Sequence, residues 1–317
     1  MTLRDYQEHI STDAARLLEW CNIAYLSMQV RTGKTLTALA AADKYFMETL
    51  NFHEMLRKRK NVLFVTKKKA IESIENDFKS GGFIYALTVI NYEQLHNYEG
   101  NPDLIILDEA HCLGQFPKPA ERTKLLKLIC ENKPIIYLSG TPTPESWSQL
   151  YHQLYVSSFS PFKEYSNFYK WATDYVKVKK MYRYNREHND YSSADKQKID
   201  AATKHLFISY TQEEAGFKQE VQEEVLTIRM KNETYALAER LKKDRVFVSK
   251  KSGKEVIADT EVKLMNKLHQ IYSGSVITED GEAQIFDNSK ADFIREYFRG
   301  QKIAIMYKYK AEYAMLV

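Results

Sequence analysis

Cysteine is scarce in this 317-residue chain, which has three cysteines and no CxxC pair. Cys21, Cys112 and Cys130 stand far apart, in apolar or helical surroundings. Disulfide frameworks and zinc sites need several cysteines at short, regular spacings. The sequence therefore argues against both, and it predicts buried, reduced thiols of the kind found in cytosolic proteins.

Long apolar runs are also missing. No stretch approaches the ~18 apolar residues that a membrane-spanning helix needs. The first residues, Met1 to Tyr6, are charged and lack the apolar core of a signal peptide. We therefore expect no membrane partner and a cytoplasmic location, which is the host cytoplasm if the chain is viral.

The composition sets broader limits. Hydrophobic residues make up 44% of the chain and charged residues 28%, which is typical of a globular protein that buries a core. The formal net charge of +4 permits a nucleic-acid partner without requiring one. The length of 317 residues suits one large domain or two ordinary ones.

The most informative stretch of the sequence lies between two regular elements. An apolar run, Ile23–Leu26, precedes it, and Leu36–Leu50 follows with helical spacing. Strand, tight turn, Gly33-Lys34-Thr35 and helix are the parts of a P-loop. In such a loop the helix N-terminus holds phosphate, the lysine adds charge for the β- and γ-phosphates, and the threonine can ligate Mg²⁺.

The loop departs from the usual pattern at two positions. Met28 stands where a glycine is expected five residues before Gly33, and Arg31 stands where many related loops carry another glycine. An alternative is therefore a basic helix start that Thr32 caps, with Lys34 in solvent. The predicted ATP contacts within the loop are Arg31, Thr32, Gly33, Lys34 and Thr35.

Strands and helices alternate through the first half. The predicted strands are Ile23–Ser27, Asn61–Thr66, Leu87–Ile90, Leu104–Leu107 and Ile135–Leu138; the predicted helices are Leu36–Leu50, Lys69–Lys79 and Ala120–Asn132. Several strands are apolar on both faces, as a buried parallel sheet requires. The pattern predicts an α/β, doubly wound parallel sheet, in which ligands bind beyond the carboxyl ends of the strands.

Two further motifs follow predicted strands. Asp108-Glu109 comes directly after Leu104–Leu107, so Asp108 can hold Mg²⁺ and Glu109 can polarise an attacking water. The alternative is a helix start with acidic residues, but Gly33-Lys34-Thr35 upstream favours catalysis by Lys34, Asp108 and Glu109. The turn 139–142, Ser-Gly-Thr-Pro, is either a link to the γ-phosphate site or a plain turn.

Gly-Lys-Thr, Asp-Glu-Ala-His and Ser-Gly-Thr-Pro, in this order, resemble motifs I, II and III of superfamily-two helicases. Leu3–Gln7 is similar to the LRxYQ that precedes motif I in the Swi/Snf-type branch, and the variant loop looks most like Swi/Snf-related helicases of bacteriophages. The resemblance implies a RecA-like P-loop fold, ATP and Mg²⁺ as cofactors, and adenine recognition by Gln7, beside Arg4.

The same resemblance assigns further residues. Residues 65–67 resemble motif Ia and 89–93 motif Ib, which implies nucleic-acid contacts by Thr66, Lys67, Asn91 and Tyr92. Coupling of hydrolysis to movement is expected from His111, Ser139 and Thr141. Glu145 departs from the family, because remodellers often have asparagine there.

The segment from Lys163 to Arg186 is basic, with interleaved aromatic residues. Such a segment suits a nucleic-acid surface, or its aromatics pack it onto the first domain. Beyond it we predict strands Glu224–Met230 and Lys302–Met306, and helices Asn232–Lys243, with Asn232 as cap, Leu264–Ile271 and Ser289–Phe298.

The expected organisation has three parts. Residues 1–158 form the ATP-binding lobe one, 159–223 a basic, aromatic, helical linker or insertion, and 224–317 the beginning of an incomplete second RecA-like lobe. Motifs V and VI, with the arginine finger, have no counterpart. We therefore expect a truncated fragment that binds ATP and hydrolyses it weakly.

The sequence thus predicts an ATP-dependent DNA helicase or translocase. Three alternatives stay open: an RNA helicase, a non-catalytic nucleic-acid-binding module with a degenerate P-loop, and the motor of a restriction or nuclease assembly. DNA is favoured by residues 3–7 and 89–93, and the partner could be duplex or single-stranded. The oligomeric state is open.

Overall fold

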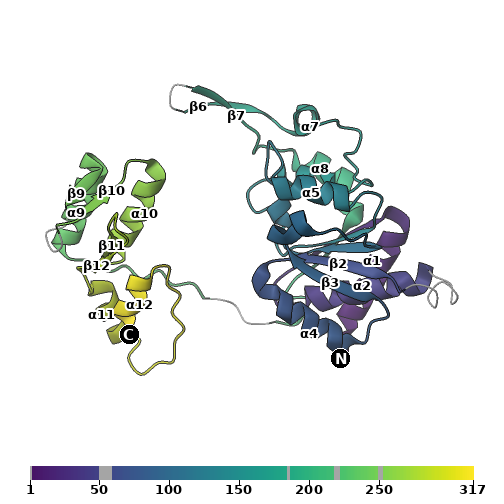
Figure 1. The fold of residues 1–317 in the computed structure, drawn as a ribbon, viewed down its shortest axis with the longest axis horizontal. Helices are drawn as coiled ribbons and strands as arrows, with labels where there is room; N and C mark the ends of the chain where they lie inside the picture. Colours follow the sequence, from purple (N-terminus) through teal and green to yellow (C-terminus); the bar gives the residue numbers. More distant parts are fainter. Residues whose placement is uncertain (1, 50–58, 184–185, 218–221, 249–252) are drawn as a thin grey trace. The chain divides into compact units, whose positions relative to one another are not determined.

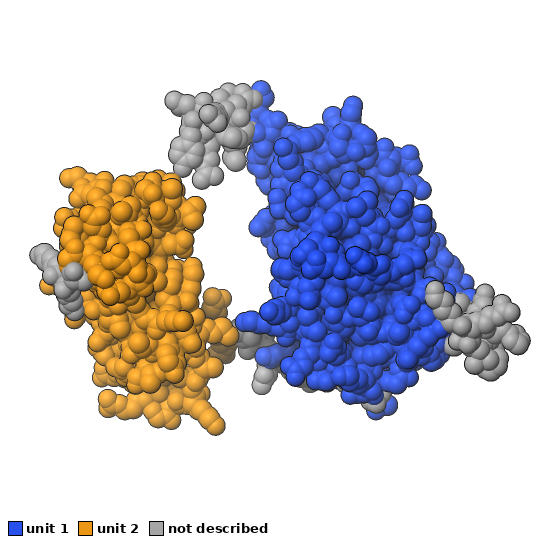
Figure 2. All heavy atoms as spheres, in the orientation of Figure 1, with its two compact units in different colours: residues 1–219 blue, residues 220–317 orange. Residues whose placement is uncertain are grey.

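The computed structural model describes residues 2–49, 59–183, 186–217, 222–248 and 253–317. The chain divides into two compact units, Met1–Gln219 and Glu220–Val317, which Figure 2 colours separately. No helix in the described part of the chain is long and apolar enough to cross a membrane. The predicted division into lobe one, linker and lobe two stays a prediction.

Unit 1 is built on a parallel six-stranded sheet with the order β3-β2-β4-β5-β1-β8. The strands are β1 (Ile23–Met28), β2 (Asn61–Thr66), β3 (Ala86–Asn91), β4 (Leu104–Leu107), β5 (Ile135–Leu138) and β8 (Phe207–Tyr210). The predicted fold class, an α/β doubly wound sheet of the RecA-like kind, is confirmed.

Alternation along the central strands divides the core into two layers. Even-numbered residues such as Ala24, Phe64 and Ile106 pack against α1 (Asp5–Cys21), α2 (Lys34–Thr49) and α4 (Ile71–Gly81). Odd-numbered residues of the same strands pack against α5 (Glu121–Ile129), α6 (Gln149–Tyr155), α7 (Phe168–Tyr175) and α8 (Lys196–Thr203). Figure 1 shows α1, α2 and α4 on one face and α5 and α8 on the other. Both faces are covered, so the strands are apolar throughout.

Strand β8 and helix α1 are absent from the sequence-based expectation. β8 pairs with β1 from Tyr25↔Phe207 to Met28↔Tyr210. It is a four-residue edge strand with an exposed Ser209, so its pattern is short and weak. Helix α1 buries Ile10, Ala14 and Leu18, which lie four residues apart on one face.

The basic, aromatic segment is part of unit 1. Phe168 and Trp171 are buried in its core, whereas Lys163, Lys170 and Lys177 are exposed. Strands β6 (Lys179–Arg183) and β7 (Arg186–Asp190) follow as an antiparallel hairpin. Phe168 and Trp171 therefore pack this segment onto the core of unit 1, which was one of the two interpretations of the sequence.

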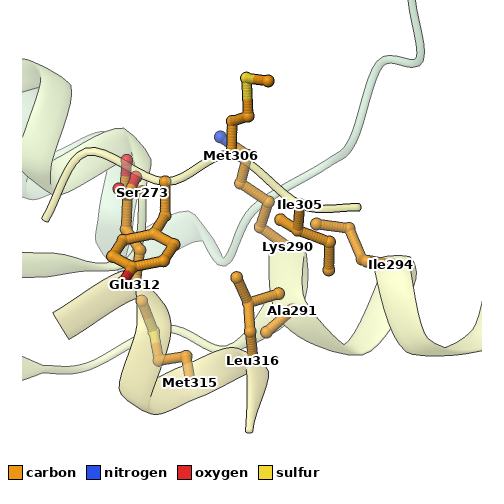
Figure 3. A pocket seen from close by; sticks show the side chains of 10 residues that line it. Ser273, Lys290, Ala291, Ile294, Ile305, Met306, Glu312, Met315 and Leu316 are labelled. Atoms are coloured by element: carbon orange, nitrogen blue, oxygen red, sulfur yellow. The ribbon is translucent and has the colours of Figure 1, made fainter. Parts of the chain in front are cut away.

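Unit 2 consists of helices and short antiparallel hairpins. Its elements are α9 (Asn232–Asp244), β9 (Val246–Val248), β10 (Glu255–Ile257), α10 (Glu261–Tyr272), β11 (Ser275–Ile277), β12 (Ala283–Ile285), α11 (Ser289–Tyr297) and α12 (Lys310–Leu316). β9 pairs with β10, and β11 with β12. A cavity of about 70 Å³ lies between α11, α12 and residues 305–307 (Figure 3).

Two predicted strands of unit 2 are wrong. Glu224–Met230 and Lys302–Met306 form no ladder with any described residue, and most of their side chains are exposed. Met306 is 99% exposed. Alternation and β-branched residues make a segment suitable for a sheet, but a strand also needs a neighbour to pair its backbone groups.

Asp287 joins the beginnings of α9 and α11. The predicted cap Asn232 is the first residue inside α9, and the cap position is Lys231. The Lys231 backbone N–H donates to Asp287 Oδ2 at 2.9 Å, and the Thr234 hydroxyl donates to the same oxygen. Ser289 donates to Oδ1 through its N–H (2.9 Å) and its hydroxyl (2.6 Å). Burial raises the pKa of Asp287, but these hydrogen bonds outweigh it and lower the pKa to about 2.

Substitution of Asp287→Asn is expected to destabilise unit 2 by about 2 kcal/mol at pH 7. Because the carboxyl pKa is lower in the folded state, this stabilisation is complete above the unfolded value of 3.8 and is lost as the pH falls towards about 2. Hydrogen exchange of peptides from residues 231–289, measured over a series of urea concentrations at several pH values, checks both the loss of stability and its pH dependence.

The matched control is Asp292→Asn, because Asp292 is exposed and its one ion pair with a described residue is to Arg295, on the surface of α11. Trp20, Trp147 and Trp171, the three tryptophans, lie in unit 1, so their fluorescence reports whether unit 1 stays unchanged. Equal destabilisation by both substitutions would contradict the role of Asp287.

Candidate nucleotide-binding site

Three strand ends bring the predicted site residues to one edge of the sheet. β1 leads into residues 29–33 and Lys34, β4 leads into Asp108, and β5 leads into Ser139. The strands lie in the order β4-β5-β1, all parallel, so their carboxyl ends meet at the same edge. Lys34, Asp108 and Ser139 therefore come from neighbouring strands.

The loop 29–33 turns its carbonyl groups away from the helix start. Gln29 O accepts from the Thr32 hydroxyl at 2.7 Å, Val30 O from Gln212 Nε2 at 2.9 Å, and Thr32 O from the Tyr6 hydroxyl at 3.0 Å. The first N–H groups of α2 have no partner within the helix. With the carbonyls engaged elsewhere, the inner side of the loop is left with donors, which suits phosphate.

Backbone conformation supports this loop shape. Arg31 and Gly33 have φ angles of 67° and 81°, in the left-handed region. A Cβ on Gly33 would overlap the side-chain nitrogen of Gln7, so a larger residue would have to displace the Gln7 amide as well as adopt the left-handed conformation. Met28, where a glycine was expected, is the last residue of β1 and is fully buried. The position holds an ordinary strand residue.

Gln7 and Arg4 lie beside this loop. The Gln7 Nε2 group donates to Thr32 O and to Gly33 O at 3.4 Å each, and Gln7 Oε1 accepts from the Arg4 backbone N–H at 2.9 Å. The Arg4 guanidinium donates to the Tyr6 hydroxyl at 3.2 Å. Both ends of the Gln7 amide are thus engaged within the chain. Its recognition of adenine stays a prediction.

Lys34 reaches the other two strand ends. A Cβ on Gly140 would be in ordinary van der Waals contact with Lys34 Nζ and Met28 O, at 3.5 Å each, so the Lys34 ammonium group lies beside the turn that follows β5. The pKa of Asp108 is raised above its usual value, mainly by burial and also by the charge of Glu109. A hydrogen bond from Thr66 and the charge of Lys34 act in the opposite direction. Lys34 and Asp108 are therefore close enough to interact electrostatically.

Two residues that the sequence assigned to nucleic acid hold Asp108 in place: Thr66 binds its carboxylate, and Tyr92 binds its backbone carbonyl oxygen. The hydroxyl of buried Thr66 donates to Asp108 Oδ2 at 2.7 Å, and the Tyr92 hydroxyl donates to Asp108 O at 2.6 Å. Hydrogen-bonding side chains of this kind fix a ligand carboxylate in one orientation. The structure thus places Thr66 and Tyr92 at the acidic pair, and their contact with nucleic acid stays a prediction.

The other two residues of that assignment differ in exposure. The Asn91 side chain accepts from Gln94 N at 2.9 Å and caps the short helix η2 (Tyr92–Asn97). Asn91 is buried, whereas Lys67 is exposed and is followed by Lys68 and Lys69, which are exposed too. Lys67 is therefore the member of the set that is open to a polyanion.

Glu109, His111 and Ser139 form a chain from β4 to β5. His111 Nδ1 lies 3.3 Å from Glu109 Oε2 and 3.0 Å from Ser139 Oγ. Ser139 is fully buried, and its oxygen also accepts from Thr141 N at 3.2 Å. Glu109 has a φ of 50°, a left-handed conformation that is costly outside glycine and asparagine. The surrounding contacts thus hold Glu109 in an unusual backbone conformation, which sets the position of its carboxylate.

Several supporting residues escaped the sequence analysis. The Tyr25 hydroxyl donates to Gln153 Oε1 at 2.6 Å, and Gln153 Nε2 donates to Pro142 O at 2.8 Å, which anchors the turn after Thr141. Gln212 N donates to Gln29 Oε1 at 2.8 Å. Gln29 and Gln212 are 183 residues apart, and no local pattern signals such a contact.

A magnesium ion fits the donors at this edge. Mg²⁺ takes oxygen ligands and binds through one or two side chains together with substrate phosphates. The Thr35 hydroxyl, in the first turn of α2, and the Asp108 carboxylate supply such oxygens. Among the described residues no group of three or more His, Cys, Asp or Glu could hold a metal by itself.

Comparisons with known proteins agree on the fold. No family model and no curated protein matches the chain. The SWI2/SNF2 ATPase core domain of Sulfolobus solfataricus is similar in structure, with a TM-score of 0.50 and 15% identity, over 86% of this chain and 57% of that one. The chain thus shares the RecA-like α/β fold of that domain.

Two restriction enzymes match less well. A nuclease-deletion mutant of the Type ISP restriction-modification enzyme LlaGI, in complex with a DNA substrate mimic, has a TM-score of 0.33 and 16% identity, over 45% of this chain and 18% of that one. The ATP-dependent Type ISP enzyme LlaBIII, bound to DNA, has a TM-score of 0.31 and 18% identity, over 45% and 13%. The fold assignment rests on the archaeal structure. The chain spans less than two thirds of each of these three proteins.

Substitution of Gln212→Ala is expected to loosen the loop 29–33, because it removes the donor to Val30 O. One lost hydrogen bond is worth about 1 kcal/mol, so amide hydrogens of residues 29–33 should exchange about fivefold faster. Hydrogen exchange without nucleotide measures this directly. Gln197→Ala, an exposed change on α8, is the matched control. Unchanged exchange in Gln212→Ala would show that the contact does not hold the loop.

Proposed function

We propose that this chain is a DNA helicase or translocase motor that binds ATP and hydrolyses it weakly, in a reaction that depends on DNA. The observation that carries the proposal is the meeting of Lys34, Asp108 and Ser139 at the ends of three adjacent strands. Phosphoryl transfer to water depends mostly on positioning and charge stabilisation, and this edge offers both.

Each residue then has a distinct task. The N–H groups at the start of α2 and the Lys34 ammonium bind the β- and γ-phosphates. Thr35 and Asp108 would hold Mg²⁺, which neutralises phosphate charge when bound. Glu109 orients the attacking water and accepts its proton, while His111 fixes the Glu109 carboxylate from 3.3 Å.

Coupling to a polymer follows from the chain of contacts between strands. His111 joins Glu109 to Ser139, and Ser139 joins Thr141, so a change at the γ-phosphate reaches the turn after β5. Exposed Lys67, Lys68 and Lys69 follow β2 at the same edge of the sheet and suit a phosphate backbone. DNA is the proposed polymer because residues 3–7 and 89–93 resemble the Swi/Snf-type motifs.

Lys34→Ala is expected to weaken Mg·ATP binding at least tenfold, because the ammonium group supplies charge to the phosphates. Lys79→Ala, an exposed change in α4, is the matched control. Glu109→Gln should leave binding within about twofold and lower turnover about 100-fold or more, because it removes only the proton acceptor. Calorimetry measures binding, and phosphate release with duplex DNA, single-stranded DNA or RNA measures turnover.

The same assays separate the alternatives. Stimulation of ATP turnover by RNA but not by DNA would show that the polymer is RNA and would favour the RNA helicase. Nucleotide binding that Lys34→Ala leaves unchanged would contradict the site itself and favour a module that binds nucleic acid without ATP. Equal loss of binding in Lys79→Ala would show that the effect is one of surface charge.

A further inference from the structure

Unit 1 contains a cavity that is lined by hydrogen-bond donors and aromatic rings. It measures about 220 Å³, and Lys127, Lys163, four serines and aromatic side chains surround it. Among the described residues that line it there is no carboxylate. Lys127 Nζ lies 3.3 Å from the centre of the Tyr155 ring, and neither lysine forms an ion pair with a described residue. Such a lining is suited to an anion.

The four serines reinforce this character, because each hydroxyl oxygen already accepts a hydrogen bond from an N–H group. Ser157 accepts from Phe159 N, Ser160 from Phe162 N and Ser158 from Asn132 N, at 3.1 Å each, and Ser166 from Asn167 Nδ2 at 3.4 Å. None of the four hydroxyls donates to an acceptor within the described residues. Ser157 and Ser160 are 4% and 2% exposed. Their O–H groups remain available to a buried oxyanion.

A neighbouring cavity of about 130 Å³ shares Tyr151, Tyr155 and Ser166 with the first. Its other walls include Pro119, Phe168 and His152. His152 is 2% exposed, and its Nδ1 atom has no hydrogen-bond partner among the described residues. Burial lowers the pKa of His152 to about 4, so the ring is neutral at pH 7. Aromatic and proline walls with one unpartnered polar atom suit a flat heterocycle.

The lysine- and serine-lined cavity lies away from the proposed ATP site. Ser158 contacts Asn132, in the loop that enters β5, whereas Ser139 and Lys34 lie at the opposite, carboxyl edge of the sheet. We propose that the two cavities form a second nucleotide-binding site, with a phosphate group in the lysine- and serine-lined cavity and the base against Tyr151, Tyr155 and Phe168. The ligand is a nucleoside monophosphate unit, either a free nucleotide or one residue of a single strand. This proposal does not depend on the ATP site.

The test uses the 317-residue chain with Lys34→Ala, which disables the first site. Thymidine 5′-monophosphate, inorganic phosphate and thymidine are titrated by calorimetry. The monophosphate is expected to bind at least tenfold more tightly than phosphate or thymidine. Lys127→Gln and Lys163→Gln should each weaken it at least fivefold and leave thymidine unchanged. Lys124→Gln, one turn earlier in α5 and paired with Glu121 at 2.6 Å, is the matched control.

Other outcomes decide against the site. Loss of affinity in Lys124→Gln equal to that in Lys127→Gln, or a monophosphate bound no more tightly than thymidine, overturns the proposal. His152→Phe, which keeps a ring of similar shape, should weaken the monophosphate but not phosphate; an equal effect on both overturns the base position. Thermal unfolding verifies that each variant is folded. A 5′-phosphorylated hexathymidylate that binds more tightly than the monophosphate identifies a strand as the source, and the reverse identifies a free nucleotide.

Discussion

The width of a single strand sets the geometry of the proposed ATP site. β5 lies between β1 and β4, so the phosphate loop and the acidic pair are two strand spacings, or about 10 Å, apart. That distance leaves room for phosphates and a metal ion between Lys34 and Asp108. Gly140 lies in the turn that follows β5, and a Cβ on it would be in ordinary van der Waals contact with Lys34 Nζ, at 3.5 Å. The site therefore depends on the parallel pairing of β4, β5 and β1.

Hydrogen bonds from outside the site maintain the conformations inside it. Arg31 and Glu109, in two different loops, adopt left-handed backbone conformations. Such conformations persist only where the surroundings over-determine them. Gln212 and Tyr6 bind the carbonyls next to Arg31, and His111 contacts the carboxylate of Glu109. Gln212 belongs to the segment that leads out of unit 1, so the shape of the phosphate loop depends on the residues that follow β8.

Much of this fold could be predicted from sequence because the central strands are apolar on both faces. Asn61–Thr66, Leu104–Leu107 and Ile135–Leu138 have the bounds that were expected, and the motif residues lie at their carboxyl ends. The sequence pattern does not predict strands correctly where the pairing with a neighbouring strand decides whether a segment is a strand. β8 is too short to be recognised from its sequence, whereas Lys302–Met306 has the composition of a strand but pairs with no described strand. Motif position also says little about what a side chain contacts: Thr66 stands in a nucleic-acid motif, yet its hydroxyl holds Asp108.

The two proposed anion sites follow one physical rule despite their different positions. A polar lining attracts an oxyanion only when its acceptors are turned away or already engaged, because free carbonyl and hydroxyl oxygens repel negative charge. In the loop 29–33, carbonyls are engaged by Gln212 and Tyr6, and the helix N–H groups remain. In the serine-lined cavity, the hydroxyl oxygens accept backbone and amide N–H groups, and the O–H groups remain. Counting which acceptors are already occupied thus distinguishes an anion site from an ordinary polar pocket, even where the lysines alone would not.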